Sequence, residues 1–98
     1  MISMAMLHDA QRVLKPVINQ TPVIPTKGLV PGCAFYLKAD CLQKTGAFKL
    51  RGAYYKIATL SDEEKERGVI ACSAGNHAQG VAFAARDMGI KATICIPE

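Results

Sequence analysis

The pattern of residues 69–97 constrains the fold most, because two apolar runs flank a helical segment. Residues 69–73 are typical of a short buried strand, the alanine-rich residues 77–88 have helical periodicity, Gly89 ends that helix, and residues 90–97 form a second buried strand. This order predicts a right-handed β-α-β unit, in which the two strands are parallel. We therefore expect an α/β fold, built on a parallel, Rossmann-like sheet in three layers of which this chain supplies a part.

The first half of the chain predicts a helix followed by extended segments. Apolar side chains recur near a period of about 3.6 residues over 7–18, which predicts a helix, and Pro16 should end it near Lys15. Prolines and glycines interrupt residues 21–32, so we expect this stretch to be extended and irregular. Residues 35–39 predict a short strand.

Two further helices are predicted before the β-α-β unit. Apolar residues at helical spacing predict one over 48–59, and Ser61 with Glu64 forms a capping box that opens a short acidic helix ending before Gly68. One β-α-β unit with these helices cannot cover both faces of its own sheet, and the chain stops at Glu98 directly after a strand. We therefore expect a fragment, truncated within a larger α/β domain.

Composition indicates a chain that buries a core. Half of the 98 residues are hydrophobic and 20% are charged, which excludes a disordered tail.

No C-x-x-C pair occurs, so we expect free, mostly buried thiols in a reducing compartment and no metal site. There is no basic leader and no run of about 18 apolar residues, so we expect a cytoplasmic protein without a membrane partner. The cysteines are Cys33, Cys41, Cys72 and Cys95.

The net charge of +4 is concentrated in residues 38–56, where five basic side chains face only one acidic residue, Asp40. Two interpretations remain open: a solvated basic face and a site for an anion. Nucleic acid is not an expected partner, because aromatic residues are few, tryptophan is absent and no arginine-rich run occurs. The basic residues are Lys38, Lys44, Lys49, Arg51 and Lys56.

The turn between the first strand of the β-α-β unit and its helix is a candidate binding site. Ligands of parallel sheets collect at the carboxyl ends of strands, where helix N-termini present unpaired N–H groups. Gly75 allows a tight turn there, and Ser73 and Asn76 could help hold a carboxylate or phosphate. An ordinary structural turn with Asn76 as the helix N-cap explains the same residues.

Two nucleotide-binding motifs fail at this position. Gly75 and Gly80 have the spacing of a P-loop, but Val81 stands where that motif requires lysine. A dinucleotide fingerprint requires G-x-G, which does not occur in the chain. We therefore do not expect a classical nicotinamide site.

Lys49 lies at the predicted start of the helix 48–59, where the helix dipole opposes a cation by roughly 0.3–1 kcal/mol. One interpretation is a solvated surface lysine. The other is an amine with a depressed pKa, suited to forming a Schiff base with an aldehyde.

A resemblance adds weight to the second interpretation. QKTGAFKLRGA at 43–53 and SAGNHAQG at 73–80 resemble the paired signatures of the threonine dehydratase and serine racemase group of fold type II pyridoxal phosphate enzymes. Residues 21–22 and 92–98 are similar to the same group. The resemblance implies pyridoxal 5'-phosphate as cofactor, Lys49 as the catalytic lysine that bonds its aldehyde, Phe48 beside the cofactor ring and Asn76 at the pyridoxal 3-oxygen. It also implies that the substrate carboxylate is received by Ser73, Ala74, Gly75, Asn76 and His77.

The resemblance further implies how the chain is divided. Residues 1–47 would hold the N-terminal helix, extended stretch and strand, and residues 48–98 would open the smaller α/β subdomain of a catalytic domain. The glycine-rich loop for the cofactor phosphate and the polar residue facing the pyridine nitrogen are expected beyond Glu98. The fragment alone should therefore bind the cofactor weakly and be inactive.

The reaction implied is the dehydration and deamination of L-threonine, and of L-serine, to a 2-oxo acid and ammonia by a homo-oligomer, in isoleucine biosynthesis or threonine catabolism. In serine racemases a second serine follows the position of Ser73 and exchanges a proton with the opposite face of the substrate. Ala74 lacks that hydroxyl and favours a dehydratase. The alternatives are a serine racemase/dehydratase or another fold type II β-eliminating enzyme, and a non-catalytic binding module that retains the front half of the fold.

Overall fold

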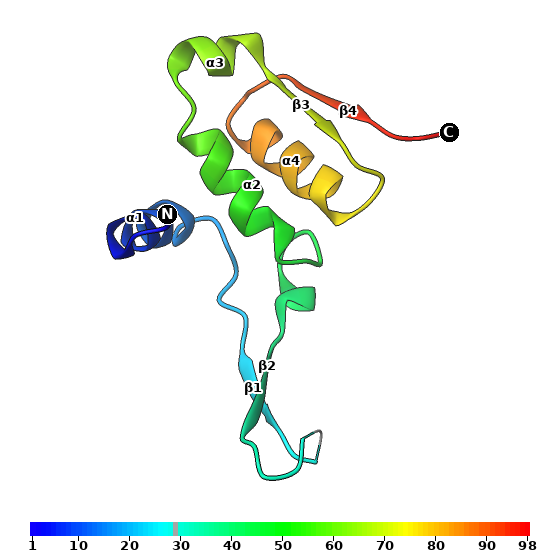
Figure 1. The fold of residues 1–98 in the computed structure, drawn as a ribbon. Helices are drawn as coiled ribbons and strands as arrows, with labels where there is room; N and C mark the ends of the chain where they lie inside the picture. The colour runs from blue at the N-terminus through cyan, green and yellow to red at the C-terminus, as the bar shows by residue number, and fades with distance from the viewer. Residues whose placement is uncertain (29) are drawn as a thin grey trace.

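The computed structural model describes residues 1–28 and 30–98, which form an elongated chain of 51 × 39 × 26 Å (Figure 1). A helical layer with one sheet lies at one end, and a hairpin projects at the other (Figure 1). In chain order the elements are α1 (Met4–Leu14), β1 (Val23–Thr26), β2 (Phe35–Lys38), η1 (Asp40–Leu42), α2 (Lys49–Ala58), α3 (Asp62–Arg67), β3 (Val69–Cys72), α4 (Asn76–Asp87) and β4 (Ala92–Cys95).

The β-α-β unit is confirmed. β3 and β4 pair in parallel, with a register that runs from Val69 opposite Ala92 to Cys72 opposite Cys95. Side chains alternate along both strands, so Val69 and Ala71 pack toward the helices while Ile70 is 72% exposed on the other face. Of the expected three layers, the described residues supply the sheet and the helical layer on one face.

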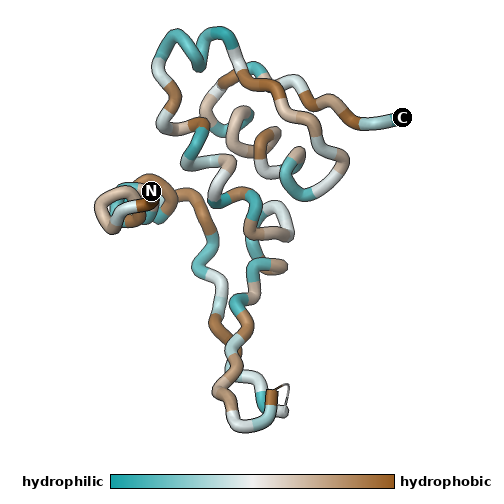
Figure 2. Tube along the Cα trace, in the orientation of Figure 1, coloured by the Kyte–Doolittle hydropathy of each residue, from teal (hydrophilic) through white to brown (hydrophobic). Residues whose placement is uncertain are grey.

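The core lies between α2 and α4. Leu50 is fully buried on the first turn of α2 and packs with side chains of α4, and α1 adds Leu14 from the side. Figure 2 shows the hydrophobic trace of β3 and β4 beside this core, and the hydrophilic trace of α3 outside it. The buried apolar residues of the core are Leu14, Leu50, Ala53, Tyr54, Ile57, Val81, Ala84 and Ala85.

Several local predictions hold, and the helix boundaries differ slightly. α1 begins at Met4 rather than at residue 7, because Ser3 caps it and accepts a hydrogen bond from the Met6 N–H at 3.3 Å. The capping box of α3 is confirmed: Ser61 Oγ accepts from the Glu64 N–H at 3.2 Å, and the Ser61 N–H donates to Glu64 Oε2 at 2.8 Å.

The stretch 21–32 is more regular than its prolines indicate. β1 and β2 form an antiparallel hairpin in which Val23 lies opposite Lys38 and Thr26 opposite Phe35. Both faces of this ribbon are largely exposed. The expectation of an irregular stretch is therefore wrong over β1.

The expectation of buried thiols is also wrong. Throughout residues 1–28 and 30–98 the cysteines are free and exposed. Cys72 and Cys95 point away from the helices on the open face of the sheet, while Cys33 precedes β2 and Cys41 lies in η1. No helix in the described ranges is long and apolar enough to cross a membrane.

Candidate functional site

Lys49 is the first residue of α2 and is exposed. Its Nζ lies 5.1 Å from the centroid of the Phe48 ring, which is itself 62% exposed. Phe48 is the N-cap, and among the described residues no side chain accepts a hydrogen bond from this end of the helix. A cation at an uncapped helix start does not favour the helix, so local stability does not explain this lysine.

The turn 73–77 leads from β3 into α4. Ser73 Oγ accepts a hydrogen bond from the Gly75 N–H at 3.3 Å, and Gly75 is the N-cap of α4. Asn76 is the first helical residue, so the interpretation of this turn as one capped by Asn76 is wrong. No side chain in the described part of the chain caps α4, which leaves the positive end of its dipole available to an anion.

α4 brings this turn against the start of α2. A β-carbon at Gly80 would lie 3.2 Å from the carbonyl carbon and oxygen of Lys49 and from the backbone nitrogen of Leu50. A cavity of about 320 Å³ opens beside this contact, and Lys49 and His77 both line it. Its full lining is Phe48, Lys49, Arg51, Gly52, Ala53 and His77.

Three of the residues expected at the site, Phe48, Lys49 and His77, therefore share one cavity. Ser73, Ala74, Gly75 and Asn76 do not line it and lie in the turn just before His77. A larger cavity of about 450 Å³ runs along α2, α3 and β3; its lining also includes His77 but not Lys49. Sequence reasoning did not identify this second cavity, whose lining is mostly apolar.

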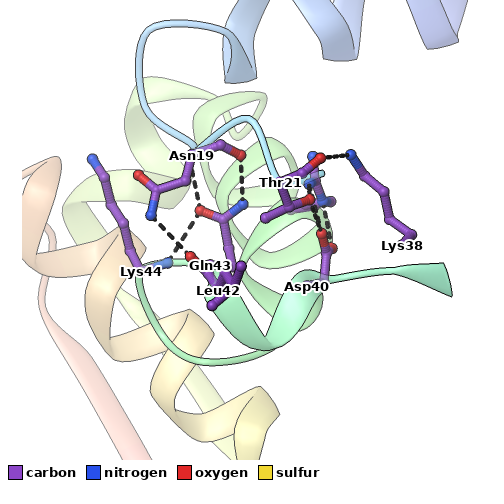
Figure 3. Close-up of polar contacts among 8 residues, drawn as sticks. Asn19, Thr21, Lys38, Asp40, Leu42, Gln43 and Lys44 are labelled. Atoms are coloured by element: carbon purple, nitrogen blue, oxygen red, sulfur yellow. Dashed lines mark hydrogen bonds and ion pairs between the residues drawn. The ribbon is translucent and has the colours of Figure 1, made fainter. Parts of the chain in front are cut away.

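The loop before Lys49 is held by a buried amide that sequence reasoning missed. Gln43 is only 4% exposed, and its side chain pairs with the backbone of Asn19 (Figure 3). The Asn19 N–H donates to Gln43 Oε1 at 2.8 Å, and Gln43 Nε2 donates to the Asn19 carbonyl at 3.0 Å. The Lys44 N–H also donates to Gln43 Oε1, at 3.1 Å. Thr45 lies two residues after Gln43, and its Oγ1 is buried without a hydrogen-bond partner in the described ranges.

Two cations of the basic segment 38–56, Lys38 and Arg51, form hydrogen bonds within the fold. Arg51 pairs with Asp40 through two hydrogen bonds, Nε to Oδ2 at 2.7 Å and Nη2 to Oδ1 at 2.9 Å. Lys38 Nζ donates to the Thr21 carbonyl at 2.6 Å (Figure 3). Hydrogen bonding from Arg51, and then from Thr21, lowers the pKa of Asp40 from 3.8 to about 2, against the opposing effect of burial. Two of the five basic side chains therefore have a structural role.

Comparison with known proteins gives the class. Residues 14–98 match the family described as pyridoxal-phosphate dependent enzyme, and the chain belongs to this family. The cofactor expected from the resemblance is thereby confirmed as that of the family.

The particular relatives are threonine-converting enzymes. The chain is 56% identical over 99% of its length to the L-threonine ammonia-lyase of Thermotoga maritima and covers 25% of that protein. It is 50% identical, again over 99% of its length, to the biosynthetic L-threonine dehydratase of Lactococcus lactis, of which it covers 24%. The chain thus spans about a quarter of the length of these relatives.

Solved structures agree with the fold. The T.th. threonine deaminase is 42% identical with a TM-score of 0.83, over 98% of this chain and 31% of that one. Maize serine racemase is 41% identical with a TM-score of 0.86, over 96% of this chain and 30% of that one. The resemblance to the threonine dehydratase and serine racemase group and the α/β fold class are therefore confirmed.

Proposed function

We propose that the protein carrying this segment is a pyridoxal phosphate-dependent ammonia-lyase that converts L-threonine to 2-oxobutanoate and ammonia, and L-serine to pyruvate and ammonia. The relatives named above support the reaction, since two of them are a threonine ammonia-lyase and a threonine dehydratase. The observation that carries the proposal is the common cavity of Lys49 and His77 at the junction of α2 and α4. The proposal includes a homo-oligomeric enzyme of the cytoplasm.

The residues present fit this cofactor. Lys49 offers a primary amine beside a cavity, and the exposed ring of Phe48 lies next to that amine. The uncapped start of α4 offers N–H groups to an anion. When bound, pyridoxal phosphate supplies an aldehyde that bonds an amine and a ring that accepts the electrons of a broken bond.

Lys49 is the residue we assign to proton transfer. Its Nζ would hold the cofactor and, as a free amine, would take the proton from the substrate α-carbon. The Phe48 ring would exclude water from one side of this amine. Asn76, exposed at the first turn of α4, would hydrogen-bond the oxygen on the cofactor ring.

The turn 73–77 is the segment we assign to the substrate carboxylate. The free N–H groups at the start of α4 and the positive end of its dipole favour a bound carboxylate there. Ser73 Oγ is already an acceptor for the Gly75 N–H, so its own O–H is free to donate to the substrate. Ala74, Gly75 and His77 complete the turn.

Serine racemase is the second candidate, because maize serine racemase matches the chain about as well as the threonine deaminase does. Racemisation requires a proton donor on the face of the substrate opposite Lys49. Ala74 carries no group that can donate a proton, and this supports the ammonia-lyase.

The test uses the full-length protein. Purified protein with pyridoxal phosphate is expected to release 2-oxobutanoate and ammonia in equal amounts from L-threonine, and Lys49→Ala should abolish this release and the absorbance band of the bound cofactor. Retention of both by Lys49→Ala would refute the site. Formation of D-serine from L-serine at a rate matching pyruvate release would favour the racemase. Size-exclusion chromatography of the same protein checks the oligomer.

A further inference from the structure

We propose that Arg51 is a positioning residue for Lys49: paired with Asp40 and Thr21, it fixes the first turn of α2, so that the Lys49 amine is held at the cavity. The inference rests on the proposed function of Lys49. Arg51 borders the same cavity as Lys49, but the role proposed for it is to orient the reactive amine, not to contact substrate or cofactor.

The hydrogen bonds around Arg51 join three separate segments. Asp40 opens η1 just after β2, Thr21 precedes β1, and Arg51 lies in the first turn of α2. Besides the two bonds between Arg51 and Asp40, Thr21 Oγ1 donates to Asp40 Oδ1 at 2.6 Å and accepts from Arg51 Nη2 at 3.2 Å. The start of α2 is therefore tied to the base of the β1–β2 hairpin.

Partial burial and two parallel hydrogen bonds make the contact between Arg51 and Asp40 rigid. Thr21 is 5% exposed, and the side chains of Asp40 and Arg51 are 13% and 29% exposed. A two-bond contact between a guanidinium and a carboxylate restricts both distance and angle, and partial burial limits competition from water. A single hydrogen bond between exposed side chains would leave the helix freer to rotate.

The start of α2 depends on such outside support. It has no side-chain N-cap among the described residues, and its first residue is a cation that the helix dipole disfavours. Lys49 and Arg51 are two residues apart, so their side chains leave the helix in directions about 160° apart. Arg51 can thus hold the turn from the hairpin side and leave the Lys49 amine free. On a third side Leu50 is fully buried against α4.

The experiment uses the full-length protein and reads out Lys49 itself. Pyridoxal phosphate is added, and borohydride reduces the C=N bond that its aldehyde carbon forms with a lysine amine. Peptide mapping then measures the rate and the fraction of labelling at Lys49. With Arg51→Ala we expect labelling of Lys49 to be about 10-fold slower. We expect kcat for L-threonine to be about 100-fold lower, with a small change in KM, because displacing a reacting group by about 1 Å lowers the rate by about that factor.

Arg51→Lys and Tyr54→Phe are the matched variants. Arg51→Lys keeps the charge but cannot form the two-bond contact, so we expect labelling and kcat between those of wild type and Arg51→Ala. Tyr54→Phe removes another hydrogen bond between α2 and a carboxylate, that of Tyr54 Oη to Asp87 Oδ2 at 2.8 Å, further from Lys49. It should lower thermal stability and leave Lys49 labelling unchanged.

Each outcome decides the inference. Normal labelling and kcat in folded Arg51→Ala, with only a lower Tm, would show that Arg51 stabilises the fold without positioning Lys49. If Arg51→Ala does not fold, Arg51→Lys decides: wild-type labelling in that variant overturns the inference. Failure of the proposed function is recognised separately, because wild-type protein would then carry no label at Lys49 whatever stands at position 51.

Discussion

Gly80 on α4 lies against the backbone of Lys49 on α2, and a β-carbon at this glycine would come within 3.2 Å of the lysine carbonyl carbon and oxygen. Backbone atoms cannot rotate away as the end of a long side chain can. The contact therefore sets how closely α4, and with it the turn 73–77, approaches the first turn of α2. Nothing in the sequence pattern around Gly80 indicates this contact with Lys49.

Gly80→Ala is expected to destabilise the protein in spite of the higher helix propensity of alanine. Propensity alone would add about 1 kcal/mol of stability. The two helices must instead separate by a few tenths of an ångström, and overpacking of this kind costs roughly 1–3 kcal/mol. Thermal unfolding followed by circular dichroism measures the change, and borohydride labelling shows whether Lys49 reacts more slowly.

Gly52→Ala is the control for stability. Gly52 lies in α2, and among the described residues nothing is within 4 Å of a β-carbon placed there. The variant should gain up to about 1 kcal/mol from propensity. Equal stabilisation by both substitutions would contradict the close contact at Gly80.

Gln43→Leu is expected to lower the free energy of unfolding by about 2–4 kcal/mol. The substitution removes the side-chain partner of three backbone groups: the N–H and the carbonyl of Asn19 and the N–H of Lys44. Gln20→Leu, at an exposed position in the same segment as Asn19, should change it by less than about 0.5 kcal/mol. Urea unfolding compares the two variants. A similar small effect of both would mean that the Gln43 amide contributes little to stability.

The Asp40 carboxylate should make stability depend on pH in the acid range. Its pKa in the folded protein is about 2, against 3.8 as its usual value. A lowered pKa contributes stability that is fully present above about pH 4 and is lost as the pH falls through about 2. We expect this contribution to be on the order of 1–2 kcal/mol.

Comparison with Asp40→Asn isolates that contribution. The difference in unfolding free energy between wild type and the variant should stay constant from pH 7 to about pH 4 and shrink toward pH 2. A difference that is the same at about pH 2.5 as at pH 7 would show that Asp40 is not held in its charged form by Arg51 and Thr21.

Features coded by local periodicity could be predicted from the sequence. The parallel pairing of β3 with β4 follows from two short apolar runs separated by one helix, and the capping box at Ser61 and Glu64 depends on residues three apart. The sequence also indicates the lysine at the start of α2, because a cation there opposes the helix dipole, and the turn before α4, because it follows a strand of a parallel sheet.

Features coded by pairing between distant residues could not be predicted. Gln43 bonds Asn19 across 24 positions, and Arg51 bonds Thr21 across 30, with nothing in the sequence between them to indicate the match. The N-cap of α4 is Gly75 rather than Asn76 because the path of the turn decides which residue lies at the helix boundary. The contact of Gly80 with Lys49 depends on the packing of two whole helices.

Cys95 is expected to react faster with iodoacetamide when its neighbour is removed. It lies opposite Cys72 in the register of β3 and β4, and hydrogen bonding with Cys72 raises the pKa of the Cys95 thiol. A raised pKa means less thiolate at a given pH, and the thiolate is the form that reacts.

Cys72→Ala should therefore lower the pKa of Cys95 and speed its alkylation at about pH 8, measured by mass spectrometry of the Cys95 peptide. Cys41→Ala, a substitution in η1, is the control and should leave the rate at Cys95 unchanged. An unchanged or slower rate at Cys95 in Cys72→Ala would show that the two thiols do not interact.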